Sequence, residues 1–199
     1  MKIGIDLDEV LGYFLPTLIE FHNSTYKTDL KINNFHSYDF WDIWGGNREE
    51  AIQKVFEFYR SDFFKNIKII DGSEEAIKKL KKDNELFIIT SRPKEIQEET
   101  FIWIENNFPN VFSEIYFTSD FSKDINLKTK KGVCDDLNID ILIEDSGDYA
   151  NNCVSSKRKV FLFNYPWNKN IQTKKGVIRI NSWEEILKEI FTLKKDPTS

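Results

Sequence analysis

The stretch Ile3-Gly4-Ile5-Asp6-Leu7-Asp8-Glu9-Val10-Leu11, near the start of the 199-residue chain, decides the fold prediction. It opens on a short apolar run, residues 2–6, which is typical of a strand buried on both faces of a sheet. Similar runs follow at residues 86–90, 139–144 and 160–163. Stretches with helical periodicity lie between or after these runs, at residues 73–82, 94–107, 130–137 and 182–193. This alternation predicts an α/β fold with a doubly wound parallel sheet, to which residues 114–118 add a strand.

One segment, residues 13–69, interrupts the alternation because it contains no clear buried strand. Residues 14–23 and 48–59 within it have helical periodicity, so we expect a helical insert after the first strand. The chain contains 17 Phe, 7 Tyr and 5 Trp, an aromatic content of 15%, and much of this excess lies in the insert. We therefore expect a Rossmann-like core, residues 1–12 and 70–199, and a small helical domain, residues 13–69.

The composition excludes several classes of function. With 28 basic and 33 acidic residues the net charge is -5, so no global positive field attracts a nucleic-acid polymer or an anionic membrane. Charges interrupt every apolar stretch, which argues against a membrane-spanning helix, and Asp6 interrupts the first run too early for a secretory signal. Cys134 and Cys153 lack metal-binding spacing and are expected to be buried, reduced thiols. We expect a cytoplasmic protein whose oligomeric state stays open.

Polar side chains follow three of the predicted strands at their carboxyl ends: Asp6 and Asp8, then Thr90, Ser91 and Arg92, and then Glu144 and Asp145. A single acid in such a place is commonly a helix cap or a solvated loop residue. In an open parallel sheet, however, ligands bind outside the carboxyl ends of the strands, so the three groups should converge on one crevice. Their ordered recurrence therefore predicts an active site there.

These motifs resemble those of the haloacid dehalogenase-like phosphohydrolases. The opening stretch is similar to the first motif of that superfamily, Phe87-Ile88-Ile89-Thr90 to the second, and Ile141-Leu142-Ile143-Glu144-Asp145 to the fourth. Within the superfamily the chain most resembles the 5'(3')-deoxyribonucleotidases, through Phe63-Phe64, Trp103 and Ser182-Trp183 in the same order. The resemblance implies a haloacid dehalogenase fold with a helical cap after the first strand, and a phosphomonoesterase acting on a nucleoside monophosphate.

The resemblance also implies roles for the acids. Asp6 would attack phosphorus and form an aspartyl-phosphate, while Asp8 would protonate the departing alcohol and then deprotonate water. A phosphoryl group repels a carboxylate nucleophile, so a divalent cation is needed, and oxygen ligands suit Mg²⁺. We expect Asp6 and Asp145 to bind it through carboxylates and Asp8 through its main-chain carbonyl. Thr90 and Ser91 would donate hydrogen bonds to the phosphoryl oxygens.

The cation that neutralises the phosphoryl group is less well defined by the sequence. Lys130 is our choice, because it lies at the predicted start of a helix, where the helix dipole also favours an anion. Lys128 and Lys131 are neighbours with the same charge. In the deoxyribonucleotidases the charge can come instead from the helix after the second motif, where this chain offers Arg92 and Lys94; we place Arg92 in the substrate site.

Glu9 departs from the family pattern, in which a small residue often follows the second aspartate. Aromatic residues of the insert are the candidates for binding a nucleobase, since base stacking on a ring contributes about 1 to 3 kcal/mol. Phe40 and Trp41 match the aromatic pair of the deoxyribonucleotidase cap, and Phe14 is a third candidate. The alternative is that these rings form the core of the insert itself.

Two other functions stay open at this stage. The same chemistry could act on a sugar phosphate or another small phosphoester, or the fold could serve as a non-catalytic phosphate-binding module. The presence of every acid that the chemistry needs favours the enzyme. The sequence leaves open the base, the sugar and the choice between 5' and 3' phosphate.

Overall fold

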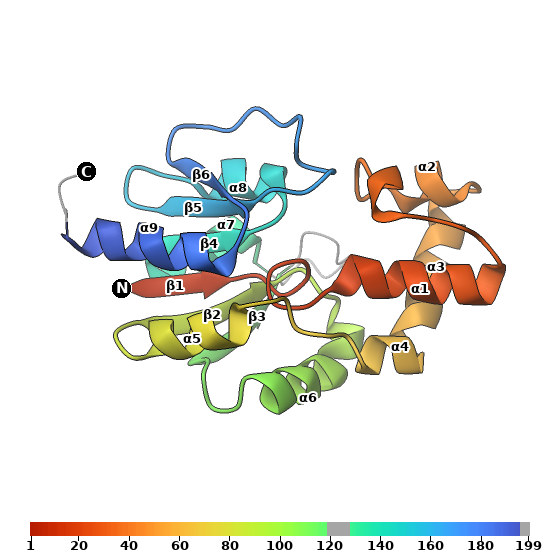
Figure 1. Ribbon diagram of the computed structural model, residues 1–199, viewed down its shortest axis with the longest axis horizontal. Coiled ribbons are helices and arrows are strands. Elements are labelled where there is room, and N and C mark those ends of the chain that lie inside the picture. The colour runs from red at the N-terminus through yellow and green to blue at the C-terminus, as the bar shows by residue number, and fades with distance from the viewer. Residues whose placement is uncertain (119–127, 196–199) are drawn as a thin grey trace.

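The computed structural model describes residues 1–118 and 128–195, which form a six-stranded parallel sheet in the order β3-β2-β1-β4-β5-β6 (Figure 1). The strands are β1 Lys2–Ile5, β2 Glu85–Thr90, β3 Glu114–Phe117, β4 Ile141–Glu144, β5 Lys159–Phe163 and β6 Val177–Ile180. Ile5 pairs with Ile88 on one side and with Ile143 on the other, so β1 is central. The strand order reverses at β1, which places a crevice at its carboxyl end.

Helices cover both faces of the sheet, as the doubly wound prediction requires. Side chains that alternate along the strands, such as Ile3 and Ile5, pack with α5 (Ser73–Lys81), α6 (Gln97–Asn107) and α9 (Trp183–Lys195). The intervening residues, among them Phe87 and Leu142, pack with α7 (Lys130–Leu137) and α8 (Gly147–Cys153). Burying one such side chain stabilises the fold by about 1.5–3 kcal/mol. The predicted α/β fold is confirmed.

The segment between β1 and α5 is helical and lies beyond the carboxyl ends of the strands (Figure 1). It contains α1 Phe14–Tyr26, the 3₁₀ helix η1 Ile32–Asn34, α2 Phe40–Trp44, α3 Arg48–Tyr59 and α4 Asp62–Lys65. Aromatic rings fill its interior: Phe58 is fully buried and lies edge-on to Phe14 at 5.3 Å and to Phe64 at 5.5 Å between ring centroids. The aromatic excess of the sequence is thus partly the core of this insert.

The two chain crossings between sheet and insert run side by side. Gly12 forms an antiparallel bridge with Ile69, and the Tyr13 amide donates to the Lys68 carbonyl at 2.9 Å. A Cβ atom at Gly12 would lie 3.0 Å from the ring of Trp103, so glycine permits this close approach. The insert is therefore joined to the core through a compact, hydrogen-bonded connection packed against α6.

Among the described strands of the sheet and the helices that cover it, β6 and α8 were not expected from the sequence. The edge strand β6 is only partly buried and carries Arg179, so it lacks the apolar run of the other strands. Helix α8 is short, and its segment Gly147–Cys153 includes a glycine and two asparagines, which are weak helix formers. The helix expected from residue 94 begins instead as a 3₁₀ turn, η2 Lys94–Ile96, before α6. Local sequence signals are weakest in these places.

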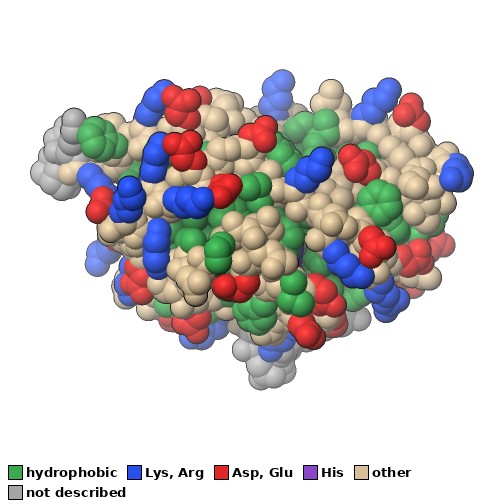
Figure 2. Space-filling view, turned by 60° about the horizontal axis from the view of Figure 1, so that its bottom comes forward, with side chains coloured by type: hydrophobic (Ala, Val, Ile, Leu, Met, Phe, Trp, Pro, Cys, Tyr) green, Lys and Arg blue, Asp and Glu red, His purple; other side chains and the backbone are tan. Residues whose placement is uncertain are grey.

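Two features of the described residues concern membranes and surface charge. No helix within residues 1–118 and 128–195 is long and apolar enough to cross a membrane. On the face shown in Figure 2, basic and acidic side chains are intermixed and do not gather into an area of one sign.

Candidate active site

Three carboxylates meet at the carboxyl ends of β1 and β4. The Asp6 amide donates to the Ile143 carbonyl at 3.0 Å, which continues the pairing of the two strands and brings Asp6 beside Glu144 and Asp145. One carboxylate oxygen from each of the three acids lies within 4.8 Å of the others. Their residues are only 7%, 0% and 3% exposed. The polar strand ends of the sequence therefore converge, as expected for an open parallel sheet.

Lys130 supplies positive charge to this cluster. Its ammonium group lies 3.1 Å from Asp6 Oδ1 and 2.7 Å from Glu144 Oε2, and it is 4.6 Å from the centroid of the Tyr149 ring. Thr129 caps α7 by accepting from the Gly132 amide, and this fixes the helix start from which Lys130 projects. Lys128 and Lys131 instead point to the surface and pair with acids of α7.

The electrostatics of the cluster call for a further cation. Burial raises the pKa of Asp6 to about 7, even though Lys130 opposes this effect. Burial and the neighbouring Glu144 raise the pKa of Asp145 well above its ordinary value. Asp6 Oδ1 is close enough to Lys130 for an ion pair, yet it accepts no hydrogen bond from a described residue. Hard oxygen donors in such a deficit of positive charge fit a divalent ion such as Mg²⁺.

One oxygen of Asp145, Oδ2, is held by two aromatic side chains that sequence reasoning missed. Trp167 Nε1 donates to Asp145 Oδ2 at 2.9 Å, and the hydroxyl of Tyr38, which comes from the insert, donates to the same atom. Burial raises the pKa of Tyr38 well above its ordinary value, so it stays a donor. Tyr38 lies two residues before Phe40 in the insert, and Trp167 follows β5; extending the strand-end rule to that strand could have found Trp167.

Neighbouring contacts brace this part of the site. Trp167 stacks on Tyr165 at 4.4 Å between ring centroids, and the Tyr165 hydroxyl donates to the Glu9 carbonyl at 2.9 Å. Asn168 Nδ2 donates to the Asp145 carbonyl at 2.6 Å. The loop after β5 therefore fixes both the side chain and the backbone of Asp145.

Asp8 and the end of β2 form the second half of the site. The Arg92 guanidinium donates to both carboxylate oxygens of Asp8, with Nη2 2.6 Å from Oδ1 and Nε 3.1 Å from each oxygen. Thr90 is buried, and its hydroxyl accepts from the Arg92 amide at 3.2 Å. The Ser91 hydroxyl lies 3.1 Å from that of Thr118. The structure thus places Arg92 on Asp8, and its predicted contact with substrate stays a prediction.

Glu9, the departure from the family pattern, has a structural place. It adopts a left-handed backbone conformation with φ of 61° at the turn after β1, and its carboxyl group accepts from the Leu15 amide at the start of α1. Burial raises the pKa of this carboxyl to about 8. Its other oxygen, Oε2, is buried without a hydrogen-bond partner among the described residues. Glu9 therefore acts as a buried cap that ties the turn to the insert.

The three aromatic residues expected to contact a base have different surroundings. Phe14 is buried against Phe58, and Phe40 stacks on Trp44 at 4.9 Å between ring centroids. Trp41 is half-buried. Phe14 and Phe40 thus contribute to packing within the insert. Contact of Phe14, Phe40 and Trp41 with substrate stays a prediction.

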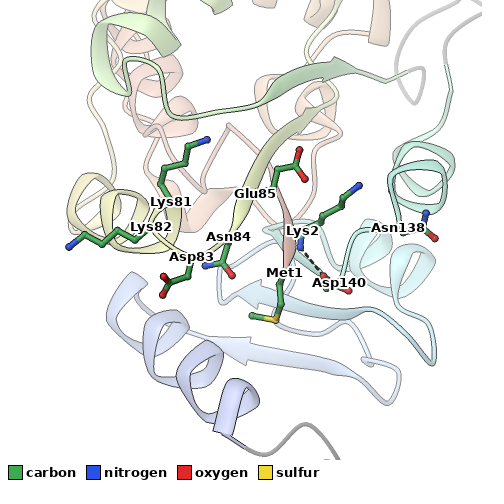
Figure 3. A pocket seen from close by; sticks show the side chains of 9 residues that line it. All are labelled: Met1, Lys2, Lys81, Lys82, Asp83, Asn84, Glu85, Asn138 and Asp140. Carbon is green, nitrogen blue, oxygen red and sulfur yellow. Dashed lines mark hydrogen bonds between the residues drawn. The ribbon is translucent and has the colours of Figure 1, made fainter.

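A surface hollow elsewhere contains none of these residues. Figure 3 shows it at the opposite edge of the sheet, where β1 and β2 begin. It is lined by Met1, Lys2, Lys81, Lys82, Asp83, Asn84, Glu85, Asn138 and Asp140. Ligands of open parallel sheets bind at the carboxyl ends, so this hollow is not the candidate site.

The chain is similar to known nucleotidases over almost its whole length. Residues 1–195 match the family described as 5' nucleotidase, deoxy (pyrimidine), cytosolic type C protein. The 5'(3')-deoxyribonucleotidase of Bacillus subtilis is 26% identical over 195 residues, covering 95% of this chain and 98% of that one.

Solved structures show the same fold at low identity. A predicted phosphatase from Clostridium acetobutylicum superposes with a TM-score of 0.70 at 19% identity, covering 96% of this chain and 98% of that one. The HAD-hydrolase YfnB of Bacillus subtilis, solved bound to magnesium, has a TM-score of 0.62 at 13% identity, with 95% and 97% covered. The chain therefore belongs to the deoxy-pyrimidine 5' nucleotidase family of haloacid dehalogenase-like hydrolases, and it is a phosphoric monoester hydrolase of the nucleotidase type.

Proposed function

We propose that this protein is a Mg²⁺-dependent phosphomonoesterase that hydrolyses nucleoside monophosphates, with 5'(3')-deoxyribonucleotides as its main substrates. The observation that carries the proposal is the meeting of Asp6, Asp145 and Lys130 beside Asp8 at one edge of the sheet, next to an aromatic insert. The family match and the activity named for the Bacillus subtilis relative support the substrate class.

The metal would be held by the carboxylates of Asp6 and Asp145 and by the main-chain carbonyl of Asp8, with Glu144 behind them. Bound there, Mg²⁺ screens the repulsion between the phosphoryl oxygens and the attacking carboxylate. Trp167 already occupies one oxygen of Asp145, which leaves the other oxygen for coordination.

In the first step, a carboxylate oxygen of Asp6 forms a bond to phosphorus as the bond from phosphorus to the nucleoside oxygen breaks. Asp8 gives its proton to that departing oxygen, so the nucleoside leaves as an alcohol. Lys130 offsets charge on the phosphoryl group, and the hydroxyls of Thr90 and Ser91 donate hydrogen bonds to its oxygens.

In the second step, water attacks the phosphorus of the aspartyl-phosphate. Asp8 takes a proton from this water, the bond between phosphorus and the Asp6 oxygen breaks, and inorganic phosphate leaves. Both acids return to their starting states. The sum of the two steps is hydrolysis of one phosphomonoester by one water.

The proposal assigns residues 13–69 as a cap over a core of residues 1–12 and 70–199. Within the cap, Phe14, Phe40 and Trp41 would line the base site. Tyr38 reaches from this segment to Asp145, so the insert already contacts the catalytic carboxylates. A cytoplasmic location belongs to the proposal too, and the buried free thiols of Cys134 and Cys153 are in keeping with it.

Phosphate release from a panel of ribo- and deoxyribonucleoside monophosphates, sugar phosphates and p-nitrophenyl phosphate tests the proposal. We expect hydrolysis of nucleotides with Mg²⁺, loss of it with EDTA, and no activity in Asp6→Asn. Trp41→Ala should raise KM for the best nucleotide about tenfold, as loss of stacking implies. Phe191→Ala, at an exposed ring on α9, serves as the matched control. A preference for sugar phosphates, or binding without turnover, would contradict the proposal.

A further inference from the structure

The hydrogen-bonding capacity of the Arg92 side chain is largely used by contacts within the protein, which distinguishes it from a residue that serves only to bind substrate. Its side chain is 1% exposed, and each of its three nitrogens donates a hydrogen bond. Nε and Nη2 bond the carboxylate of Asp8, while Nη1 donates to Thr100 Oγ1 at 3.3 Å. A planar guanidinium that bonds both oxygens of a carboxylate fixes the orientation of that carboxylate as well as its distance.

The surroundings of Arg92 fix the guanidinium in turn. Thr100 donates its hydroxyl to the Ile96 carbonyl at 2.7 Å, which directs its oxygen toward Arg92. The guanidinium carbon lies 5.0 Å from the centroid of the Phe64 ring and 5.8 Å from that of Trp103. Both rings lie within cation–π range. A buried charge braced in this way acts as part of the scaffold.

We infer that Arg92 is a positioning residue for Asp8. It holds the carboxyl group where it serves the leaving oxygen of the substrate, and it does not itself bind the phosphoryl group. This inference rests on the proposed function, in which Asp8 is the acid of the first step. It differs from the expectation drawn from sequence, which placed Arg92 in contact with substrate.

The insert takes part in this arrangement. Phe64 belongs to α4 of the insert, and Trp103 Nε1 donates to the carbonyl of Ile67 in the returning connection at 2.8 Å. The guanidinium therefore lies within cation–π range of a ring of the insert and of a ring of the core that is hydrogen-bonded to the connection. The position of Asp8 thus depends on residues from both parts of the chain.

The dependence of the rate on the leaving group tests the inference. A nucleoside 5'-monophosphate must have its leaving oxygen protonated, whereas p-nitrophenolate leaves without help. The ratio kcat/KM reports the steps through transfer of the phosphoryl group, so it isolates the action of the acid from the hydrolysis of the intermediate. Wild type, Arg92→Met, Arg92→Lys and Thr100→Val are compared on both substrates, and inhibition by inorganic phosphate is measured for each.

For Arg92→Met, we expect kcat/KM to fall about 100-fold on the nucleotide and less than about tenfold on p-nitrophenyl phosphate, with unchanged inhibition by phosphate. Arg92→Lys should recover part of the loss, because an ammonium group cannot bond both oxygens in a fixed plane. Thr100→Val keeps the shape of the side chain and should show the same selective loss in weaker form. Because it leaves Arg92 itself in place, it still tests the inference if the arginine variants fail to fold.

Equal losses on both substrates would overturn the inference. Weaker inhibition by phosphate with an unchanged kcat would show instead that Arg92 binds substrate. A wild-type enzyme that hydrolyses aryl and simple alkyl phosphates but no nucleotide would refute the proposed substrate class alone, and the comparison of leaving groups would then use those two esters. A wild-type protein that hydrolyses none of these phosphoesters would refute both proposals.

Discussion

Replacing Lys130 with methionine removes a buried ammonium group from between two carboxylates. Lys130 lies 3.1 Å from Asp6 and 2.7 Å from Glu144, and all three side chains are nearly or fully buried. Removing one partner of a buried ion pair costs about 3–5 kcal/mol, because the charge left behind is neither solvated nor paired. We expect Lys130→Met to lower the free energy of unfolding by that amount in the absence of metal.

The same substitution should reduce catalysis. Loss of one preorganised group that stabilises transition-state charge typically lowers kcat about 100- to 1,000-fold, and Lys130 is the proposed group. Lys131→Met is the matched control: this lysine follows Lys130 in the first turn of α7, its side chain is 54% exposed, and it pairs with Asp135 on the surface. An exposed pair of this type contributes less than about 1 kcal/mol.

Urea unfolding monitored by circular dichroism in EDTA gives the stability difference, and phosphate release with Mg²⁺ gives the rate. A Lys130→Met protein that is within 1 kcal/mol of wild type, roughly the surface-pair value, would refute the reasoning about the buried cluster. A Lys131→Met or Lys128→Met protein with the larger loss of activity would show that another lysine neutralises the phosphoryl group.

Two further predictions concern metal binding and pH. Trp167→Phe removes one of the two aromatic donors to Asp145 Oδ2 and should weaken Mg²⁺ binding about tenfold or more in calorimetry; an unchanged Kd would contradict an orienting role. His22 is 2% exposed and stacks on Trp44, and burial, with a smaller effect of Lys54, lowers its pKa to about 4 from 6.5. Because the unfolded chain then takes the proton first, up to about 3 kcal/mol of stability should be lost as pH falls from 6.5 to 4. His22→Phe should lack this part of the pH dependence, and identical unfolding curves against pH in the two proteins would contradict it.

The sequence predicts the sheet well where strands are buried on both faces. Strands β1, β2, β4 and β5 coincide with nearly continuous apolar runs. Such runs are typical of parallel strands that are buried on both faces. Strand β6 is not predicted because Arg179 lies within it and three of its four residues are only partly buried, so it has no distinct hydrophobic periodicity. The predicted fold follows mainly from burial.

The convergence of acids at the sheet edge could also be predicted, because parallel strands bring their carboxyl ends together. The contacts that complete the site could not. Tyr38 lies 107 residues from Asp145 in the sequence, and only the folding of the insert against the core joins them. Likewise, the position of Arg92 in the sequence does not tell whether it faces a substrate or the carboxylate of Asp8, because a cation directly after β2 could serve either role.

Transfer of the phosphoryl group to Asp6 is the central claim, and a rapid-quench experiment tests it most directly. The enzyme is mixed with Mg²⁺ and a nucleoside monophosphate labelled at phosphorus, quenched in acid within milliseconds, and digested for mass spectrometry. The mechanism predicts a labile phosphoryl group on the peptide that contains Asp6, and none in Asp6→Asn. Turnover of the nucleotide by wild type with no label on protein, or with label on a different residue, would contradict it.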